Sequence, residues 1–191
     1  MTRVFIIHRW EGHPREGWYP WMKKELGKHG CKVHVLRMPH AGRPTIPSWT
    51  SYLKKQVRFL DERTFFVGHS IGCQTILRAL KLFPEGSQAG GAVFLAPWIT
   101  LKGLEAVDDT LIAKPWETLP IDVFLVQKAL PRIVAFFSDN DYFVPLKNRV
   151  VFEREFGART IVRKQAKHFT GEDGCTQIPF ARDALIKLMG I

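Results

Sequence analysis

The chain lacks the features that mark several classes of protein. Only three of its 191 residues are cysteines, and none belongs to a CxxC pair or a Cys/His group with zinc spacing, which argues against a disulfide framework and a zinc module. No apolar run approaches the roughly 18 residues of a membrane span. Near the N-terminus only Val4–Ile7 is apolar, which is too short for a secretory signal. We therefore expect a soluble, cytoplasmic protein that needs no metal or organic cofactor and has no membrane partner.

Acidic residues are also scarce, because 18 Asp and Glu stand against 28 Lys and Arg, a formal net charge of +10. Such a charge raises the question of nucleic-acid binding. However, the basic residues occur singly or in pairs along the chain. They fall mostly on the polar sides of the expected helices, as in a solvated surface. We expect no specific nucleic-acid partner, and protein partners stay unknown.

What the sequence does contain is an alternation of short apolar runs and longer amphipathic segments, within a length that suits one domain spanning residues 1–191. The runs predict six strands, at Val4–Ile7, Val33–Leu36, Phe65–Val67, Ala92–Leu95, Ile133–Phe137 and Thr160–Val162. Helical spacing of apolar residues follows most of them, in the stripes Trp18/Trp21/Met22/Leu26, Trp49/Leu53/Val57/Leu60, Cys73/Ile76/Leu77/Leu80, Leu146/Val150/Phe156 and Ala184/Leu185/Leu188. Near-continuous apolar strands indicate a sheet covered on both faces. The prediction is an α/β fold with a doubly wound, mostly parallel sheet of about six strands and helices on both faces.

One interval, Pro97 to Leu130, has no clean period and contains three prolines. We expect short helices there, lying over the carboxyl edge of the sheet. Doubly wound folds place their ligands at that edge.

The strongest chemical signal is Gly68-His69-Ser70-Ile71-Gly72, a G-x-S-x-G motif between an expected strand and an expected helix. In a nucleophile elbow the serine occupies a strained strand-to-helix turn that exposes its hydroxyl. Glycine is needed at positions 68 and 72 because strand and helix approach closely there. The backbone amide of Ile71 then points to where an oxyanion would form.

A serine nucleophile needs a base and an orienting acid, which follow it in the chain order Ser, Asp/Glu, His in this type of fold. Of seven histidines, only His168 comes after Ser70. Two acids, Asp139 and Asp141, follow the strand Ile133–Phe137. We favour Asp141 as the catalytic acid and interpret Asp139 as a turn residue. The pair Asp108-Asp109 is farther from any strand end and ranks below both.

The second oxyanion donor usually comes from the loop after an earlier strand. Here that loop is His8-Arg9-Trp10-Glu11-Gly12. Trp10 is the expected amide donor and Arg9 the alternative. The other tryptophans are interpreted as packing residues.

With these residues in hand, the chain resembles the small serine hydrolases of the retinoblastoma-binding protein 9 and YdeN-like family, within the α/β-hydrolases. The resemblance runs almost end to end, through Ile6–Gly12, Gly17–Trp21, Leu36–Pro39, Gly68–Gly72, Ser138–Asp141 and Ala166–Phe169. It implies a compact α/β-hydrolase fold without a large lid and a triad of Ser70, Asp141 and His168. Arg9 departs from the family pattern, in which glycine often follows the histidine. The Leu-x-Cys-x-Glu pattern linked to retinoblastoma protein is absent, so that partner is not expected.

These observations predict a serine hydrolase that cleaves small-molecule carboxylic esters or thioesters of small to medium acyl groups through an acyl-enzyme on Ser70. Two alternatives stay open at this point. One is a non-catalytic binding protein on the same scaffold, because a fold does not fix a function. The other is an acyltransferase that uses the same triad.

Overall fold

Six strands form one parallel sheet in the computed structural model, which describes residues 1–191. The strand order is β2-β1-β3-β4-β5-β6, and every neighbouring pair runs in parallel. The strands are β1 Arg3–Ile7, β2 Lys32–Leu36, β3 Thr64–His69, β4 Gly91–Leu95, β5 Ile133–Ser138 and β6 Arg159–Arg163. Each contains one of the six predicted apolar runs, so the predicted sheet is confirmed.

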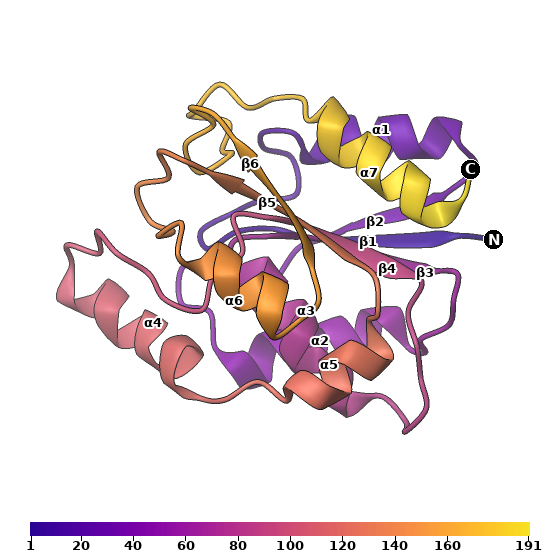
Figure 1. The fold of residues 1–191 in the computed structure, drawn as a ribbon, viewed down its shortest axis with the longest axis horizontal. Helices are drawn as coiled ribbons and strands as arrows, with labels where there is room; N and C mark the ends of the chain where they lie inside the picture. Colours follow the sequence, from indigo (N-terminus) through magenta and orange to yellow (C-terminus); the bar gives the residue numbers. More distant parts are fainter.

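Helices cover both faces of the sheet, α1 and α7 on one side and α2, α3 and α6 on the other (Figure 1). Their bounds are α1 Tyr19–Lys28, α2 Ile46–Val57, α3 Ile71–Ala79, the 3-10 turn η1 Leu80–Leu82, α4 Val107–Thr118, α5 Val123–Ala129, α6 Asn148–Arg154 and α7 Pro179–Met189. This arrangement confirms the doubly wound α/β fold.

Local sequence signals explain several helix ends. The Thr45 hydroxyl caps α2 by accepting a hydrogen bond from the Ser48 amide at 3.3 Å, which satisfies one of the free donors of the first turn. Helix α7 begins with Pro179, whose fixed φ suits a first helical turn. It ends at Gly190, which adopts the left-handed conformation at φ 72°.

Fifty buried apolar residues form one contiguous core. Strands β3, β4 and β5 are buried along their whole length, which explains why their sequences are apolar without alternation. This single core agrees with the prediction that residues 1–191 form one domain, which stays a prediction. No helix has both the length and the hydrophobicity to cross a lipid bilayer.

Two sequence-based expectations need correction. In the stripe expected around α6, Leu146 and Val150 are exposed, while Asn148 and Phe152 are the buried residues of this helix. The helix is short and packs only one turn against the sheet. The apolar spacing therefore predicted the wrong buried residues there. In the irregular interval, α4 lies at the carboxyl edge as expected, but α5 contacts η1 on the side of the sheet that α3 covers (Figure 1).

The carboxyl ends of five neighbouring strands therefore meet at one edge. Ser70 follows β3, Trp98 follows β4, Asp141 follows β5 and His168 follows β6, while the loop around Trp10 follows β1. Parallel pairing alone brings these distant segments together.

One buried side chain, that of Arg78, holds the C-terminal end of helix α4. The guanidinium of Arg78, on α3, donates to the carbonyl oxygens of Trp116 and Leu119 at 2.8 Å and of Pro120 at 3.3 Å. Its Nε donates to the side chain of Gln74 at 2.8 Å. These carbonyls belong to the last turn of α4 and the residues after it, so Arg78 fixes where α4 ends.

We expect Arg78→Met to lower the free energy of unfolding by about 2–4 kcal/mol, because it leaves several buried carbonyls without a donor. Urea denaturation of this variant measures the change. The matched control is Lys81→Met, a change at an exposed position close by, which should stay within about 0.5 kcal/mol of the wild type. Equal effects of the two variants would contradict the anchoring role.

Candidate active site

Ser70 occupies a strained turn between β3 and α3. Its φ of 53° and ψ of −120° lie in a region that residues other than glycine rarely adopt. The Ser70 amide donates to the carbonyl oxygen of Leu95 at 2.9 Å, so β4 holds the turn in place. The structure therefore has the backbone conformation predicted for a nucleophile elbow.

The two glycines of the motif are required by close backbone contacts, as the sequence predicts. A Cβ on Gly72 would lie 2.3 Å from the carbonyl oxygen of Ile7, at the end of β1. A Cβ on Gly68 would lie 2.9 Å from the Cys73 backbone, in the first turn of α3. Side chains at either position would push the helix away from the sheet.

The Ser70 hydroxyl contacts an aromatic residue that sequence reasoning treated as packing. The indole Nε1 of Trp98 donates to Ser70 Oγ at 3.3 Å. Trp98 is buried and lines the same cavity as Ser70. Its place three residues after β4, at the edge where the motif also lies, is the signal that could have identified it.

Asp141 and His168 form a direct pair, in line with the sequence-based preference. The carboxylate oxygens of Asp141 lie 2.9 and 3.1 Å from Nδ1 of His168, and both residues are buried. Asp141 Oδ1 also accepts from the amides of Phe143 and Val144 at 2.8 and 2.9 Å. The carboxylate is therefore fixed on its own loop before it meets the imidazole.

Asp139 holds the histidine loop instead of contacting the imidazole. It accepts from the amide of Gln165 at 2.7 Å. Neighbouring bonds do the same for the next residues: Ser138 Oγ accepts from Ala166, Asn140 Oδ1 from Lys167 and Asp173 Oδ2 from His168. Four consecutive loop amides thus have a fixed side-chain acceptor. Sequence reasoning missed this role because the partners lie far apart in the chain.

The two expected oxyanion donors are free. No hydrogen bond within the protein uses the backbone N–H of Trp10 or of Ile71. The alternative donor, the Arg9 amide, is engaged, because it donates to the Tyr19 hydroxyl at 3.2 Å. Of the two candidates in this loop, the geometry therefore favours Trp10.

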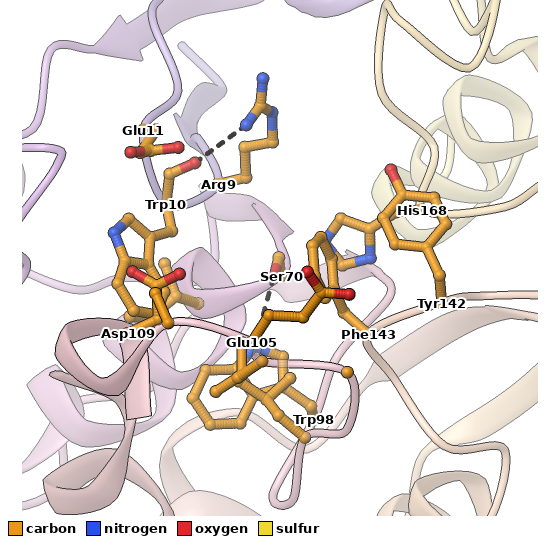
Figure 2. Close-up of a pocket in the computed structure, with 15 residues that line it drawn as sticks. Arg9, Trp10, Glu11, Ser70, Trp98, Glu105, Asp109, Tyr142, Phe143 and His168 are labelled. Carbon is orange, nitrogen blue, oxygen red and sulfur yellow. Dashed lines mark hydrogen bonds between the residues drawn. The ribbon is translucent and has the colours of Figure 1, made fainter. Parts of the chain in front are cut away.

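The Arg9 side chain points away from Ser70 in Figure 2. Its guanidinium forms ion pairs with Glu16 and Glu172, each at 3.2 Å, and donates to the Trp10 carbonyl oxygen at 3.1 Å. The residue that departs from the family pattern thus braces the loop that carries Trp10.

His8 supports the same loop from below. Its Nδ1 donates to the Arg9 carbonyl oxygen at 2.7 Å, and its Nε2 accepts from the Met38 amide at 3.1 Å. Only neutral imidazole can satisfy both partners. Burial lowers the pKa of His8 from 6.5 to about 4, so the ring stays neutral near pH 7.

Ser70 and His168 face one cavity of about 650 Å³, with Trp10 on the other side of the serine (Figure 2). No hydrogen bond joins Ser70 Oγ to His168. In catalytic pairs this bond often forms only when substrate binds. Of the acids ranked lower, Asp109 lines this cavity, whereas Asp108 pairs with Arg43 at 2.6 Å. No cluster of His, Cys, Asp or Glu in the fold could hold a metal ion.

A family model described as serine hydrolase matches residues 4–187, and the chain belongs to this family of hydrolases. YdeN of Bacillus subtilis (strain 168) is 27% identical over 187 residues, which cover 97% of this chain and 95% of YdeN. The crystal structure of the B. subtilis ydeN gene product superposes with a TM-score of 0.90 over the whole of both chains, at 23% identity.

One further relative supports this family, and one further structure supports the fold. The serine hydrolase RBBP9 of Rattus norvegicus is 25% identical over 137 residues, which cover 70% of this chain and 67% of RBBP9. The structure of Est1E from Butyrivibrio proteoclasticus has a TM-score of 0.74 at 16% identity, covering all of this chain and 89% of Est1E. The resemblance inferred from the sequence is thereby confirmed.

The buried histidines predict how stability depends on pH. Burial, more than any other cause, also lowers the pKa of His69 well below its usual value. The unfolded chain binds protons that the folded protein excludes, so stability falls as pH decreases below about 6.5. For His8 alone the expected loss between pH 6.5 and 5 is about 1.5 kcal/mol, and His69 adds to it.

Urea denaturation at pH 7, 6 and 5 measures this dependence. A free energy of unfolding that stays constant over this range would contradict the neutral, buried state of both rings. His29→Gln is the control, because His29 is exposed and the variant should keep the pH dependence of the wild type.

Proposed function

We propose that the protein hydrolyses carboxylic esters or thioesters through a covalent acyl-enzyme on Ser70. The observation that carries the proposal is the buried Asp141–His168 pair, at 2.9 Å, which faces the same cavity as the strained serine. A carboxylate that fixes an imidazole at the same cavity as a serine hydroxyl is the arrangement by which serine hydrolases activate the hydroxyl.

The proposed reaction uses each group in turn. Ser70 Oγ attacks the carbonyl carbon while Nε2 of His168 accepts its proton, and Asp141 stabilises the imidazolium that forms. The amides of Ile71 and Trp10 stabilise the negative oxygen of the tetrahedral intermediate. His168 then protonates the leaving alcohol or thiol as the intermediate collapses. Water, activated by the same imidazole, attacks the acyl-enzyme and releases the acid.

The contact with Trp98 is compatible with this chemistry. A hydroxyl donates one hydrogen bond and accepts two, so Ser70 Oγ can accept from the indole and still donate its proton to His168. The indole N–H also favours negative charge on the oxygen as the proton leaves. We therefore assign Trp98 to the orientation of the nucleophile.

Kinetics with p-nitrophenyl acetate and a short-chain thioester test the proposal. We expect Ser70→Ala to lower kcat by roughly 10⁴-fold or more and Asp141→Asn to lower kcat by roughly a hundredfold or more. Asp139→Asn is the matched control, because Asp139 contacts a loop amide and not the imidazole, and asparagine keeps an acceptor oxygen. Its effect should therefore stay near tenfold or less.

Full activity in folded Ser70→Ala protein, or equal effects of the two aspartate variants, would contradict the proposal. If wild-type protein binds such esters without turning them over, a binding function would take its place. Transfer of the acyl group to added alcohols or amines in preference to water would instead indicate an acyltransferase.

The cavity also suggests which substrates suit the site. Its volume lies within the range of small-molecule pockets, and Trp10, Trp98, Leu101 and Phe143 supply apolar walls. Its charged lining residues are Arg9, Glu11, Glu105 and Asp109. None of the three acids takes part in an ion pair, whereas Arg9 is already paired with two glutamates. The cavity is thus acidic although the whole protein is basic.

We expect positively charged esters to react faster than neutral ones of the same shape. Acetylthiocholine and 3,3-dimethylbutyl thioacetate form such a pair, and kcat/KM should favour the cation by about threefold to tenfold at low salt. The preference should shrink with added salt and in Glu105→Gln or Asp109→Asn protein, but not in Glu85→Gln, whose exposed side chain lies outside the cavity. Equal kcat/KM values for the two thioesters would contradict it.

A further inference from the structure

Two buried polar residues outside the proposed triad connect its parts. The Tyr19 hydroxyl lies 2.7 Å from Nδ1 of His69, and Nε2 of His69 lies 2.8 Å from the carbonyl oxygen of His168. The same hydroxyl lies 3.2 Å from the Arg9 amide nitrogen. A continuous chain of hydrogen bonds therefore runs from the loop after β1 to the histidine loop.

The chemistry of the partners fixes the direction of each bond. The His168 carbonyl can only accept, so Nε2 of His69 must carry a proton and donate. In a neutral ring Nδ1 is then the acceptor, and Tyr19 must donate to it. The lone pairs of the Tyr19 oxygen remain for the Arg9 N–H. Every donor in the chain thus has one acceptor.

The surroundings keep both side chains neutral and fixed. Tyr19 and His69 are 2% and 1% exposed, and burial raises the pKa of Tyr19 and lowers the pKa of His69. The Trp18 ring packs on both side chains, with centroid distances of 4.4 Å to Tyr19 and 5.6 Å to His69. A neutral pair in a close-packed site has one stable arrangement.

The hydrogen-bond chain reaches each group of the proposed active site. Arg9 precedes Trp10, whose amide is the proposed oxyanion donor, and His69 precedes Ser70. At its other end the hydrogen-bond chain contacts the backbone carbonyl of His168 itself. That backbone needs support, because its neighbours Lys167 and Phe169 both have positive φ, 47° and 58°. A strained loop keeps its shape only when its surroundings determine it.

We propose that Tyr19 and His69 are positioning residues that set the relative placement of the Trp10 amide, Ser70 and His168. This inference rests on the proposed function, since it assigns the two residues an effect on that reaction. Neither side chain lines the cavity, so neither touches the substrate. Their loss should therefore change the rate of the chemical step more than substrate binding.

Tyr19→Phe is the most direct test, because it removes the hydroxyl and keeps the ring that packs against Trp18. With p-nitrophenyl acetate we expect kcat to fall by about tenfold or more while KM stays within about twofold. Tyr52→Phe is the matched control, because Tyr52 is half-buried on α2. It should keep the kcat of the wild type.

A second pair of variants, at His69, distinguishes the loss of a hydrogen bond from a loss of packing. His69→Gln keeps an amide that can donate to the His168 carbonyl, so it should retain more activity than His69→Leu. The double variant Tyr19→Phe/His69→Gln should be little slower than the slower single variant, because two members of one chain act as a unit.

The ¹⁵N chemical shifts of the His69 ring give a readout that needs no activity. We expect the neutral Nε2–H tautomer in both wild-type and Tyr19→Phe protein, because the His168 carbonyl still accepts from Nε2. The Nδ1 shift should change in Tyr19→Phe, because that nitrogen loses its donor. A wild-type kcat in folded Tyr19→Phe protein, or an effect on KM alone, would overturn the positioning role. Finding the Nδ1–H tautomer in the wild type would overturn the chain itself. If Ser70 proves inactive while the Nε2–H tautomer is present, the proposed function fails and the hydrogen-bond chain stands.

Discussion

The close approach of α3 to the end of β1 is the constraint on which the site depends. It is possible only because residue 72 has no side chain, since a Cβ there would lie 2.3 Å from the Ile7 carbonyl oxygen. That approach places the first amides of α3, which have no partner in their own helix, beside the loop that follows β1. Ile71 and Trp10 line the same cavity at this edge for that reason. The strain at Ser70 is the conformational consequence of the same tight turn.

Around this turn, the loops are held mostly by bonds from side chains to the backbone. Asp139, Asn140 and Asp173 fix the amides of the histidine loop, while His8 and Arg9 fix the loop that carries Trp10. Such bonds are directional and belong to loops at strand ends, so they preserve the geometry of the site. Groups held in place before the reaction supply much of the transition-state stabilisation in hydrolases.

The sequence is sufficient for the sheet and for the residues that follow strand ends. Strands β3, β4 and β5, buried on both faces, produce continuous apolar runs, and the edge strands β2 and β6 keep shorter ones. The chain order of the motif left His168 as the one candidate base for Ser70 and two candidate acids, of which Asp141 was favoured. What the sequence does not reveal are contacts between segments far apart in the chain. Trp98 and Ser70 are 28 residues apart, and Tyr19 and His69 are 50 apart. In the sequence, Trp98, Tyr19 and His69 look like ordinary packing residues. Only the three-dimensional arrangement separates a packing role from a positioning role.

An activated serine at position 70 would react covalently with a fluorophosphonate probe, and labelling of the folded protein measures this reactivity. Intact-mass spectrometry of wild-type protein should show a single adduct, which peptide mapping should assign to Ser70 and which His168→Ala should form more slowly. Ser70→Ala protein should remain unlabelled. An absence of labelling in folded wild-type protein, or an adduct on another residue, would contradict the activation of Ser70.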